Sequence, residues 1–327
     1  MLSPKSGARL DRMKRRSNSG KFHHRWKRKF FALLLIAICL ATFLLMESEY
    51  SRIKMPPLIS PPLQKPKIAF LFIARNRIPL DIVWDAFFQV DWGAASMIQA
   101  ERILLRSALT DPFNERFLFL SDSCIPLYNF SYTYDYLVSS PNSFVDSFAD
   151  KKESRYNLKM YPVISVDDWR KGSQWVVLTR NHAKVVVEDK TVFSIFQLQC
   201  KPAGTSAEHD CVPDEHYVQT LLTLKGLGGE IIRRSLTHSS WDLTSSRDPH
   251  KKGWHPVTYK LADATSRLIQ SIKAIDNMYF ETEYRREWCT SKGKPSPCFL
   301  FARKFTRPTA LRLLNMSAFG FSKEATT

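Results

Sequence analysis

Alternating blocks of apolar and polar residues fill the chain from residue 67 onward, and they predict strands followed by helices. Residues 67–73 form a short apolar run after a proline, as expected of a strand, whereas apolar residues recur at helical spacing through 78–88. Residues 97–109 repeat the helical pattern, and 116–120 form a second run typical of a buried strand. This alternation predicts an α/β domain built on a mainly parallel sheet flanked by helices.

The rest of this domain continues the mixture of strand and helix patterns. We expect strands at 143–148, 173–178 and 230–233, and helices near 183–196, 213–225 and 262–275. Ligands of open α/β sheets bind beyond the carboxyl ends of the strands. We therefore expect 74–77 and 121–126 to lie at the binding edge of the sheet.

The N-terminal part of the chain follows a different pattern, in which a basic segment precedes an apolar one. Residues 1–29 hold eleven Lys and Arg against one acidic residue, and the next seventeen residues, 30–46, carry no charge. Such a run is at the short end of what spans a bilayer, and its basic flank places the N-terminus in the cytosol. We interpret it as an uncleaved signal anchor, with a buried core helix and a cleaved signal peptide as the alternatives.

The segments after the apolar run define the remaining domain organisation. Residues 47–66 are dense in proline, which interrupts helices and sheets, so they are expected to form an extended stem. Residues 67–327 would then form a lumenal domain. A short span suits the thin membranes of the early secretory pathway, so we expect a single-pass type II protein of the Golgi membrane.

The net charge of +17 is concentrated in the tail, because residues 1–29 alone supply ten of these charges. The sequence shows no zinc-finger spacing and no basic-aromatic repeat of the kind found in nucleic-acid modules. Nucleic acid is therefore not an expected partner.

Cysteines and glycosylation sequons acquire a meaning in a lumenal domain. Cys39 lies in the apolar run and leaves five others, of which Cys124 has no near neighbour in sequence. Close spacing in an oxidising compartment predicts two disulfides, Cys200–Cys211 and Cys289–Cys298. Two Asn-x-Ser sequons, at Asn129 and Asn315, are candidate sites of N-glycosylation.

The most informative candidate chemistry lies at the start of the helix expected at 213–225. Pro213 suits a first helical turn, and Asp214 and Glu215 favour the positive end of the helix dipole. One interpretation is therefore simple capping. The other is that a carboxylate held at this position acts as a general base on a substrate hydroxyl.

Four ordered motifs then resemble one family. They are Ser-Asp-Ser-Cys-Ile-Pro-Leu-Tyr at 121–128, Trp-Arg-Lys-Gly-Ser-Gln-Trp at 169–175, Pro-Asp-Glu-His-Tyr at 213–217 and Cys-Phe-Leu-Phe-Ala-Arg-Lys-Phe at 298–305. Together they are similar to the core-2/I-branching β-1,6-N-acetylglucosaminyltransferase family, in particular its plant branch. The resemblance covers 67 to about 314 and implies a GT-A-like fold, a UDP-sugar donor, a glycan acceptor and inverting transfer.

The resemblance assigns roles to individual residues. It makes Glu215 the general base, with Asp214 as its partner at the helix start. Lys304, together with Arg303, would neutralise the leaving diphosphate, because the sequence has no Asp-x-Asp to hold a metal ion. No metal or other cofactor is therefore expected. A solvated basic face is the alternative for the two cations.

Donor and acceptor contacts are expected on two of the motifs. Asp122 follows a buried strand and is a candidate for ribose or sugar hydroxyls, although a turn-forming role ahead of Pro126 fits equally well. The second motif offers aromatic faces and polar groups suited to an acceptor sugar: Trp169, Arg170, Lys171, Ser173, Gln174 and Trp175. Trp175 fits a buried strand as well.

The sequence departs from the family pattern after Gln89, where several tens of residues that we would expect in relatives are absent. The absent piece would include the family's second strand and a loop that helps to hold uridine. Two functional hypotheses follow: an active inverting glycosyltransferase, and a non-catalytic lumenal homologue that binds UDP-sugar poorly. A glycoside hydrolase is a distant third, because no second acid stands out beside Glu215.

Overall fold

The computed structural model describes residues 29, 33–45, 65–73, 94–150, 155–201, 211–241 and 256–316 of the 327-residue chain. The chain divides into two compact units, Met1–Gln64 and Lys65–Thr327. The predicted helix at 78–88, the loop at 74–77, most of the basic tail and nearly all of the stem lie outside the described residues. These expectations stay predictions.

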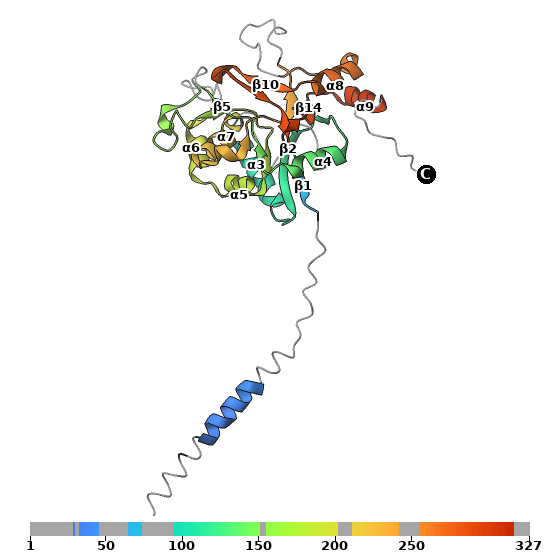
Figure 1. Ribbon diagram of the computed structural model, residues 1–327. Coiled ribbons are helices and arrows are strands. Elements are labelled where there is room, and N and C mark those ends of the chain that lie inside the picture. The colour runs from blue at the N-terminus through green and yellow to red at the C-terminus, as the bar shows by residue number, and fades with distance from the viewer. Residues whose placement is uncertain are drawn as a thin grey trace, which may run out of the picture. The chain divides into compact units, whose positions relative to one another are not determined.

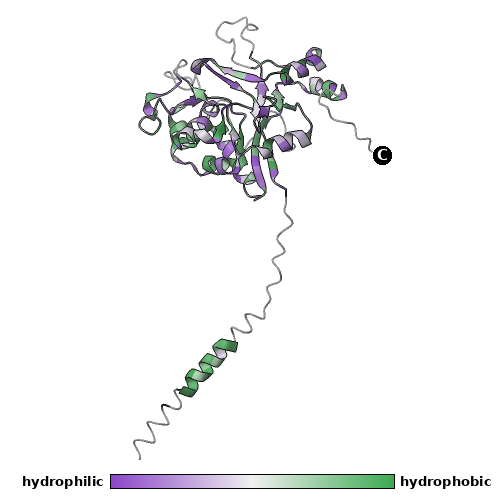
Figure 2. Cartoon of the chain, in the orientation of Figure 1, coloured by the Kyte–Doolittle hydropathy of each residue, from purple (hydrophilic) through white to green (hydrophobic). Residues whose placement is uncertain are grey.

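The described part of the first unit is mainly a helix over residues 33–45, and it is apolar along its length (Figure 2). Its large side chains are exposed, with Leu33 at 66% and Phe43 at 63%. Within the described residues, no helix is both long and apolar enough to cross a membrane. The predicted signal anchor, which extends beyond 33–45 on both sides, stays a prediction.

The second unit is built on a mixed five-stranded sheet with the order β1-β2-β7-β4-β8 (Figure 1). Its strands are β1 (Lys67–Ile73), β2 (Asn114–Ser121), β7 (Val177–Thr179), β4 (Ser143–Phe144) and β8 (Ile231–Ile232). β1 runs parallel to β2 and β4 parallel to β8, whereas β7 is antiparallel to both of its neighbours.

Four of the five strands therefore run in the same direction, as expected of a mainly parallel sheet, and β7 is the exception. A parallel connection needs a crossover, usually through a helix. In the described residues between β4 and β7 the chain forms only a single 3₁₀ turn and the short antiparallel strands β5 (Phe148–Ala149) and β6 (Arg170–Lys171). The chain therefore returns in the opposite direction and enters the sheet as an antiparallel strand.

Alternate side chains of β2 reach opposite faces of the sheet, as the period of a strand requires. Phe117 and Phe119 join a core formed with four helices: α3 (Ala95–Ala108), α5 (Arg180–Glu188), α6 (Thr191–Gln199) and α7 (Tyr217–Leu224). Leu118 and Leu120 join a second core with α4 (Phe130–Ser139). The domain is thus a layered α/β structure, which fits a GT-A-like fold.

A smaller assembly, formed mainly by the C-terminal part of the chain, completes the second unit. The sheet β3-β14-β9 (Ile125–Pro126, Phe301–Arg303, Thr237–Ser239) lies next to the hairpin β10–β11 (Asn277–Phe280, Arg285–Trp288) (Figure 1). Helices α8 (Ser266–Lys273) and α9 (Arg307–Asn315) pack on a third core. The remaining elements are β12 (Thr290–Ser291), β13 (Lys294–Pro295), η1 (Leu158–Met160), η2 (Pro213–Glu215), η3 (Leu227–Glu230), η5 (Leu261–Asp263) and η6 (Glu281–Glu283).

Both expected disulfides are present, Cys200–Cys211 and Cys289–Cys298, and Cys124 is a free thiol. Burial raises the pKa of the Cys124 thiol. Each bridge closes a short loop, with sequence separations of 11 and 9. In the chain-entropy model such loops stabilise the fold by about 2.5–3 kcal/mol each.

The predicted helix at 183–196 is instead two helices, because Asp189 ends the first and begins the second. Its backbone is extended at the C-cap of α5, while its carboxylate accepts hydrogen bonds from the backbone N–H groups of Val192 and Phe193 at 3.1 and 2.8 Å. An aspartate that caps the next helix in this way favours a break over a continuous helix. The chain consequently turns between α5 and α6.

Candidate active site

Four segments that are far apart in sequence meet at the start of η2. Asp214 and Glu215 come from η2, Glu101 from α3, Trp175 from the segment before β7, and Arg303 from the end of β14. The Arg303 guanidinium lies 4.4 Å from the centre of the Trp175 ring, and its charge lowers the pKa of Asp214 in opposition to burial. The structure therefore brings together the second, third and fourth motifs.

Glu215 is the accessible member of the acidic pair. Its side chain is 29% exposed, and Arg155 donates to its Oε2 at 3.1 Å. The backbone of Glu215 is fixed as well, because its carbonyl accepts a hydrogen bond from the Gly172 N–H at 2.9 Å. Glu215 therefore presents a partly exposed carboxylate, paired with an arginine, on a hydrogen-bonded backbone.

Asp214 lies below the surface, at 3% exposure, and cannot contact a substrate in the same way. Burial and then the charge of Glu215 raise the pKa of its carboxyl to about 7. Glu101 on α3 is equally buried, and burial followed by the charge of Asp214 raises its pKa well above the usual range. Oδ1 of Asp214 and Oε1 of Glu101 find no hydrogen-bond partner among the described residues.

The raised pKa of Asp214 predicts a pH-dependent loss of stability. The folded chain keeps the proton up to about pH 7, whereas the unfolded carboxyl loses it near 4, so stability falls as pH rises between these values. In Asp214→Asn this loss is removed. We expect the variant to gain about 1–3 kcal/mol over the original chain at pH 8, and much less at pH 4.5.

Urea unfolding of the chain at pH 4.5, 6 and 8 measures this difference. Asp135→Asn is the matched control, because Asp135 is an exposed aspartate on α4. If the stability of Asp214→Asn and of the original chain depends on pH in the same way, the pKa of Asp214 is not raised by folding.

The two tryptophans of the second motif lie in the core and present no face to solvent. Trp169 is 1% exposed and stacks on His216 at 4.5 Å and on Phe196 at 5.6 Å. Trp175 is 3% exposed, in agreement with the alternative of a buried strand. The expectation that these rings stack on an acceptor sugar is therefore corrected. Both rings are core side chains: Trp169 packs on His216 and Phe196, and Trp175 packs on Arg303.

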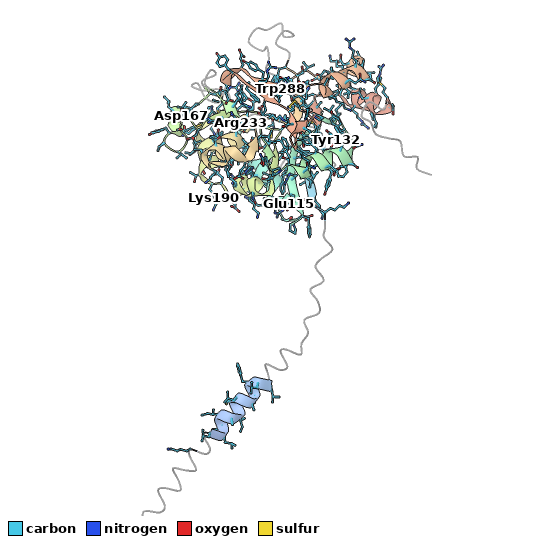
Figure 3. All side chains as sticks on the ribbon, viewed as in Figure 1. Glu115, Tyr132, Asp167, Lys190, Arg233 and Trp288 are labelled. Atoms are coloured by element: carbon cyan, nitrogen blue, oxygen red, sulfur yellow. A yellow bond between two sulfur atoms is a disulfide. The ribbon has the colours of Figure 1, made fainter. Side chains whose placement is uncertain are left out.

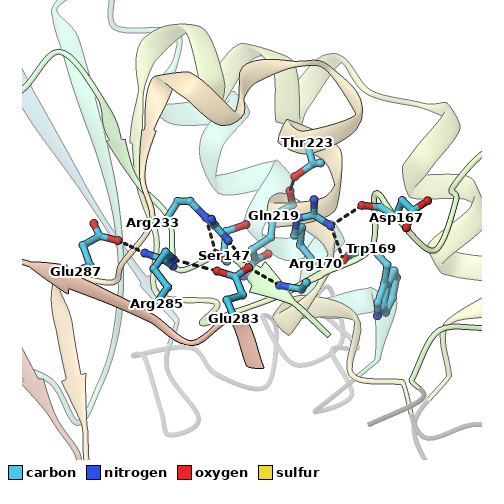
Figure 4. Close-up of polar contacts among 11 residues, drawn as sticks. Ser147, Asp167, Trp169, Arg170, Gln219, Thr223, Arg233, Glu283, Arg285 and Glu287 are labelled. Carbon is cyan, nitrogen blue, oxygen red and sulfur yellow. Dashed lines mark hydrogen bonds and ion pairs between the residues drawn. The ribbon is translucent and has the colours of Figure 1, made fainter. Parts of the chain in front are cut away.

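The polar members of the same motif contact the protein itself (Figure 4). Arg170 donates to the carbonyl oxygens of Asp167 and Trp169 at 2.6 and 2.9 Å. The carbonyl of Ser173 accepts a hydrogen bond from Gln219. Gln174 is buried, and its amide Nε2 has no hydrogen-bond partner among the described residues. Lys171 is half-buried in β6. Apart from the buried Gln174, these side chains remain partly accessible beside Glu215.

The remaining predicted site residues, Asp122 and Lys304, each follow a strand. Asp122 is exposed in the turn after β2, at the carboxyl end of that strand. Lys304 is half-buried directly after Arg303, and its backbone carbonyl accepts from the Tyr259 N–H at 2.8 Å. The charge of Arg303 lowers the pKa of Asp214, in opposition to burial. Within the described ranges, no three His, Cys, Asp or Glu side chains are grouped to hold a metal ion.

Glu101 and Arg155 were not singled out from the sequence. Glu101 occurs at helical spacing with Met97, Ile98 and Leu105, which are buried on the same helix. An acidic residue on the apolar face of a predicted helix is unusual, and this position could have identified Glu101 as a buried acid. Arg155 carried no comparable signal.

Comparison with known proteins assigns the family. The family model described as "Branch: Core-2/I-Branching enzyme" matches residues 89–273. The chain belongs to the Core-2/I-branching enzyme family and is a glycosyltransferase. Among individual relatives it is similar to a protein from Oryza sativa subsp. japonica named Glycosyltransferase BC10, with 56% identity over 305 residues that cover 77% of this chain and 76% of the relative.

The same alignment bears on the segment expected to be absent after Gln89. It spans 305 residues, whereas 77% of 327 residues is about 252, so about 53 aligned positions have no residue in this chain. Strand β1 pairs only with β2 among the described residues, and its Phe72 is 60% exposed. An interior strand that has lost a neighbour would have this appearance.

Proposed function

We propose that this glycosyltransferase moves a sugar from a UDP-sugar to a hydroxyl of a glycan with inversion, and that Glu215 is the general base. The observation that carries this proposal is the contrast within the acidic pair: Glu215 is accessible, and Asp214 is buried. The acceptor hydroxyl approaches the Glu215 carboxylate, which takes its proton as the oxygen attacks the anomeric carbon. Asp214 and Glu101 are buried between η2 and α3 and help to position η2.

Departure of UDP requires positive charge at the diphosphate. Arg303 and Lys304 follow one another at the end of β14, and Arg303 already lies among the site residues. We assign the diphosphate contact to Lys304, which is half-buried, in place of a metal ion, because the sequence has no Asp-x-Asp. Arg303, at 6% exposure, would add positive charge from inside the site. Asp122, at the end of β2, is assigned to hydroxyls of the donor.

A non-catalytic lumenal homologue is the second candidate, and specific observations favour it. About 53 aligned positions of the rice relative have no counterpart here, and β1 has one paired edge among the described residues. If the absent piece contributes to the donor pocket, UDP binding will be weak even though Glu215 and Arg303 are in place.

Two measurements on the full-length chain separate these candidates. Active transfer predicts that UDP raises the thermal stability, since a ligand at about 100 times its Kd stabilises the folded state by about 2.7 kcal/mol. It also predicts radiolabel transfer from a UDP-sugar panel that EDTA leaves unchanged and that Lys304→Ala weakens through a higher donor KM. Activity that is lost in EDTA and restored by manganese would overturn the assignment of the diphosphate to cations. A chain that neither binds UDP nor transfers sugar, beside an active version with the segment restored, would establish the non-catalytic reading.

We also propose that the chain is a single-pass type II protein of the Golgi membrane, with 30–46 as anchor and 67–327 in the lumen. The sequon residues Asn129 and Asn315 are exposed, and Asn129 caps α4 through Oδ1, which leaves Nδ2 available for a glycan. In microsomes, external protease should spare everything after the anchor, and endoglycosidase should increase the mobility. Digestion of the C-terminal domain in intact microsomes would contradict this topology.

A further inference from the structure

The hairpin β10–β11 presents two chemically different faces. Its register pairs Tyr279 with Arg286 and Asn277 with Trp288, and these four side chains share one face because side chains alternate along a strand. The other face carries Phe280 and its neighbours. We call the first set, Asn277, Tyr279, Arg286 and Trp288, the outer face of the hairpin.

The outer face is aromatic and largely exposed. Tyr279 is 53% exposed and Trp288 60% exposed, and the Arg286 guanidinium lies 5.6 and 6.0 Å from the centres of their rings. Arg286 also donates to Oδ1 of Asn277 at 2.9 Å. A guanidinium at these distances attracts both rings, so the three side chains form one cluster, which we call the platform. In Figure 3 Trp288 lies at the surface of the domain.

The inner side of the hairpin is fixed to the segment that carries the acceptor-side motif. Glu283, in the turn, accepts a hydrogen bond from the Ala149 N–H at 2.9 Å and pairs with Arg233 and Arg285 (Figure 4). Ala149 on β5 pairs in turn with Arg170 on β6.

Two residues after Arg170, the Gly172 N–H binds the carbonyl of Glu215. The turn of the hairpin is therefore linked through β5 and β6 to the backbone of the proposed general base.

The chemistry of the outer face suits a sugar chain. Flat aromatic rings can lie against the C–H faces of pyranose rings, while a guanidinium and an amide can bind hydroxyl groups. Large exposed rings gathered on one face mark a binding surface more often than scattered ones do. The tryptophans of the second motif are buried, whereas Tyr279 and Trp288 of the hairpin are exposed.

We propose that the outer face of the β10–β11 hairpin is a distal subsite that binds the acceptor oligosaccharide beyond the sugar that reacts. The proposal rests on the proposed function in one respect: the glycan it binds is the acceptor of the transfer reaction. It predicts that the enzyme prefers long acceptors over short ones, and that Tyr279 and Trp288 set this preference.

The test compares a β-linked methyl monosaccharide with hexasaccharides of β-1,4-xylose, β-1,4-glucose and β-1,3-galactose, using the full-length chain. In the double variant Tyr279→Ala/Trp288→Ala, we expect the ratio of hexasaccharide to monosaccharide kcat/KM to fall about tenfold. Phe130→Ala is the matched control, because Phe130 is a 64% exposed ring on α4. A ratio that is the same in the double variant and the original chain would overturn the subsite.

Direct binding keeps the test independent of turnover. Calorimetric titration of the same hexasaccharides, without a donor, should detect binding in the original chain and in Phe130→Ala, and a loss of about tenfold in affinity in the double variant. If transfer fails with every acceptor while this binding pattern holds, the subsite stands and the proposed reaction fails. If none of the hexasaccharides binds, or if the double variant binds as well as the original chain, the subsite is overturned.

Discussion

Glu215→Gln is expected to lower turnover by about 10²–10⁴-fold while the acceptor KM changes little. Glutamine keeps the shape of the side chain and the backbone contact with Gly172, but it cannot take a proton. The contact from Arg155 to Oε2 survives if the amide oxygen occupies that position. The loss should therefore fall on the chemical step and not on folding or acceptor binding.

Single-turnover kinetics with a radiolabelled donor, combined with a thermal melt of each variant, measures this effect. Glu188→Gln is the matched control, because Glu188 is an exposed glutamate at the end of α5. Normal turnover in Glu215→Gln would remove the general-base assignment. Equal losses in both variants would indicate a general effect of the substitution.

Gly172→Ala is expected to destabilise the fold by about 2–4 kcal/mol and to abolish activity at 37 °C. A Cβ on Gly172 would lie 1.8 Å from the carbonyl oxygen of Asp146 and 2.9 Å from Nε2 of Gln219. The first neighbour is backbone, so relief requires β6 to move away from the segment after β4. Such a movement also displaces the N–H that holds Glu215.

Urea unfolding at pH 7 gives the change in stability, and circular dichroism shows whether the variant folds. Gly228→Ala provides the control, since a Cβ there meets nothing within 4 Å. Gly172→Ala with the stability of the original chain would mean that the close approach of β6 to Asp146 is not maintained in solution.

The strand-helix order of the second unit was predictable because its signals are local. Strand β2 lies where a continuous apolar run predicted it, and α3 covers nearly all of the predicted helix. The direction of β7 was not predictable, since direction depends on how the chain returns after β4. The hairpin β10–β11 was also missed, because its charged residues mask the alternation of a strand.

The site was predictable in its acids but not in what surrounds them. The Asp214–Glu215 pair stood out by sequence, whereas its unequal exposure depends on the packing of η2 against α3 and α7. The burial of Trp169 follows from its stacking with Phe196 and His216, which come from other segments. Aromatic residues in a motif give no sign of whether they face a ligand or a core.

Strand β1 has the composition of a sheet interior, with the sequence Lys-Ile-Ala-Phe-Leu-Phe-Ile, but it pairs on one side only among the described residues. An apolar strand with an open edge is a template for pairing with other chains, and natural proteins usually protect such edges with charge or proline. Proline stands just before β1, at Pro66, and Lys67 supplies the strand's single charge. For this chain, yield and monodispersity on purification therefore report on whether the edge of β1 is covered, before any assay of sugar transfer is made.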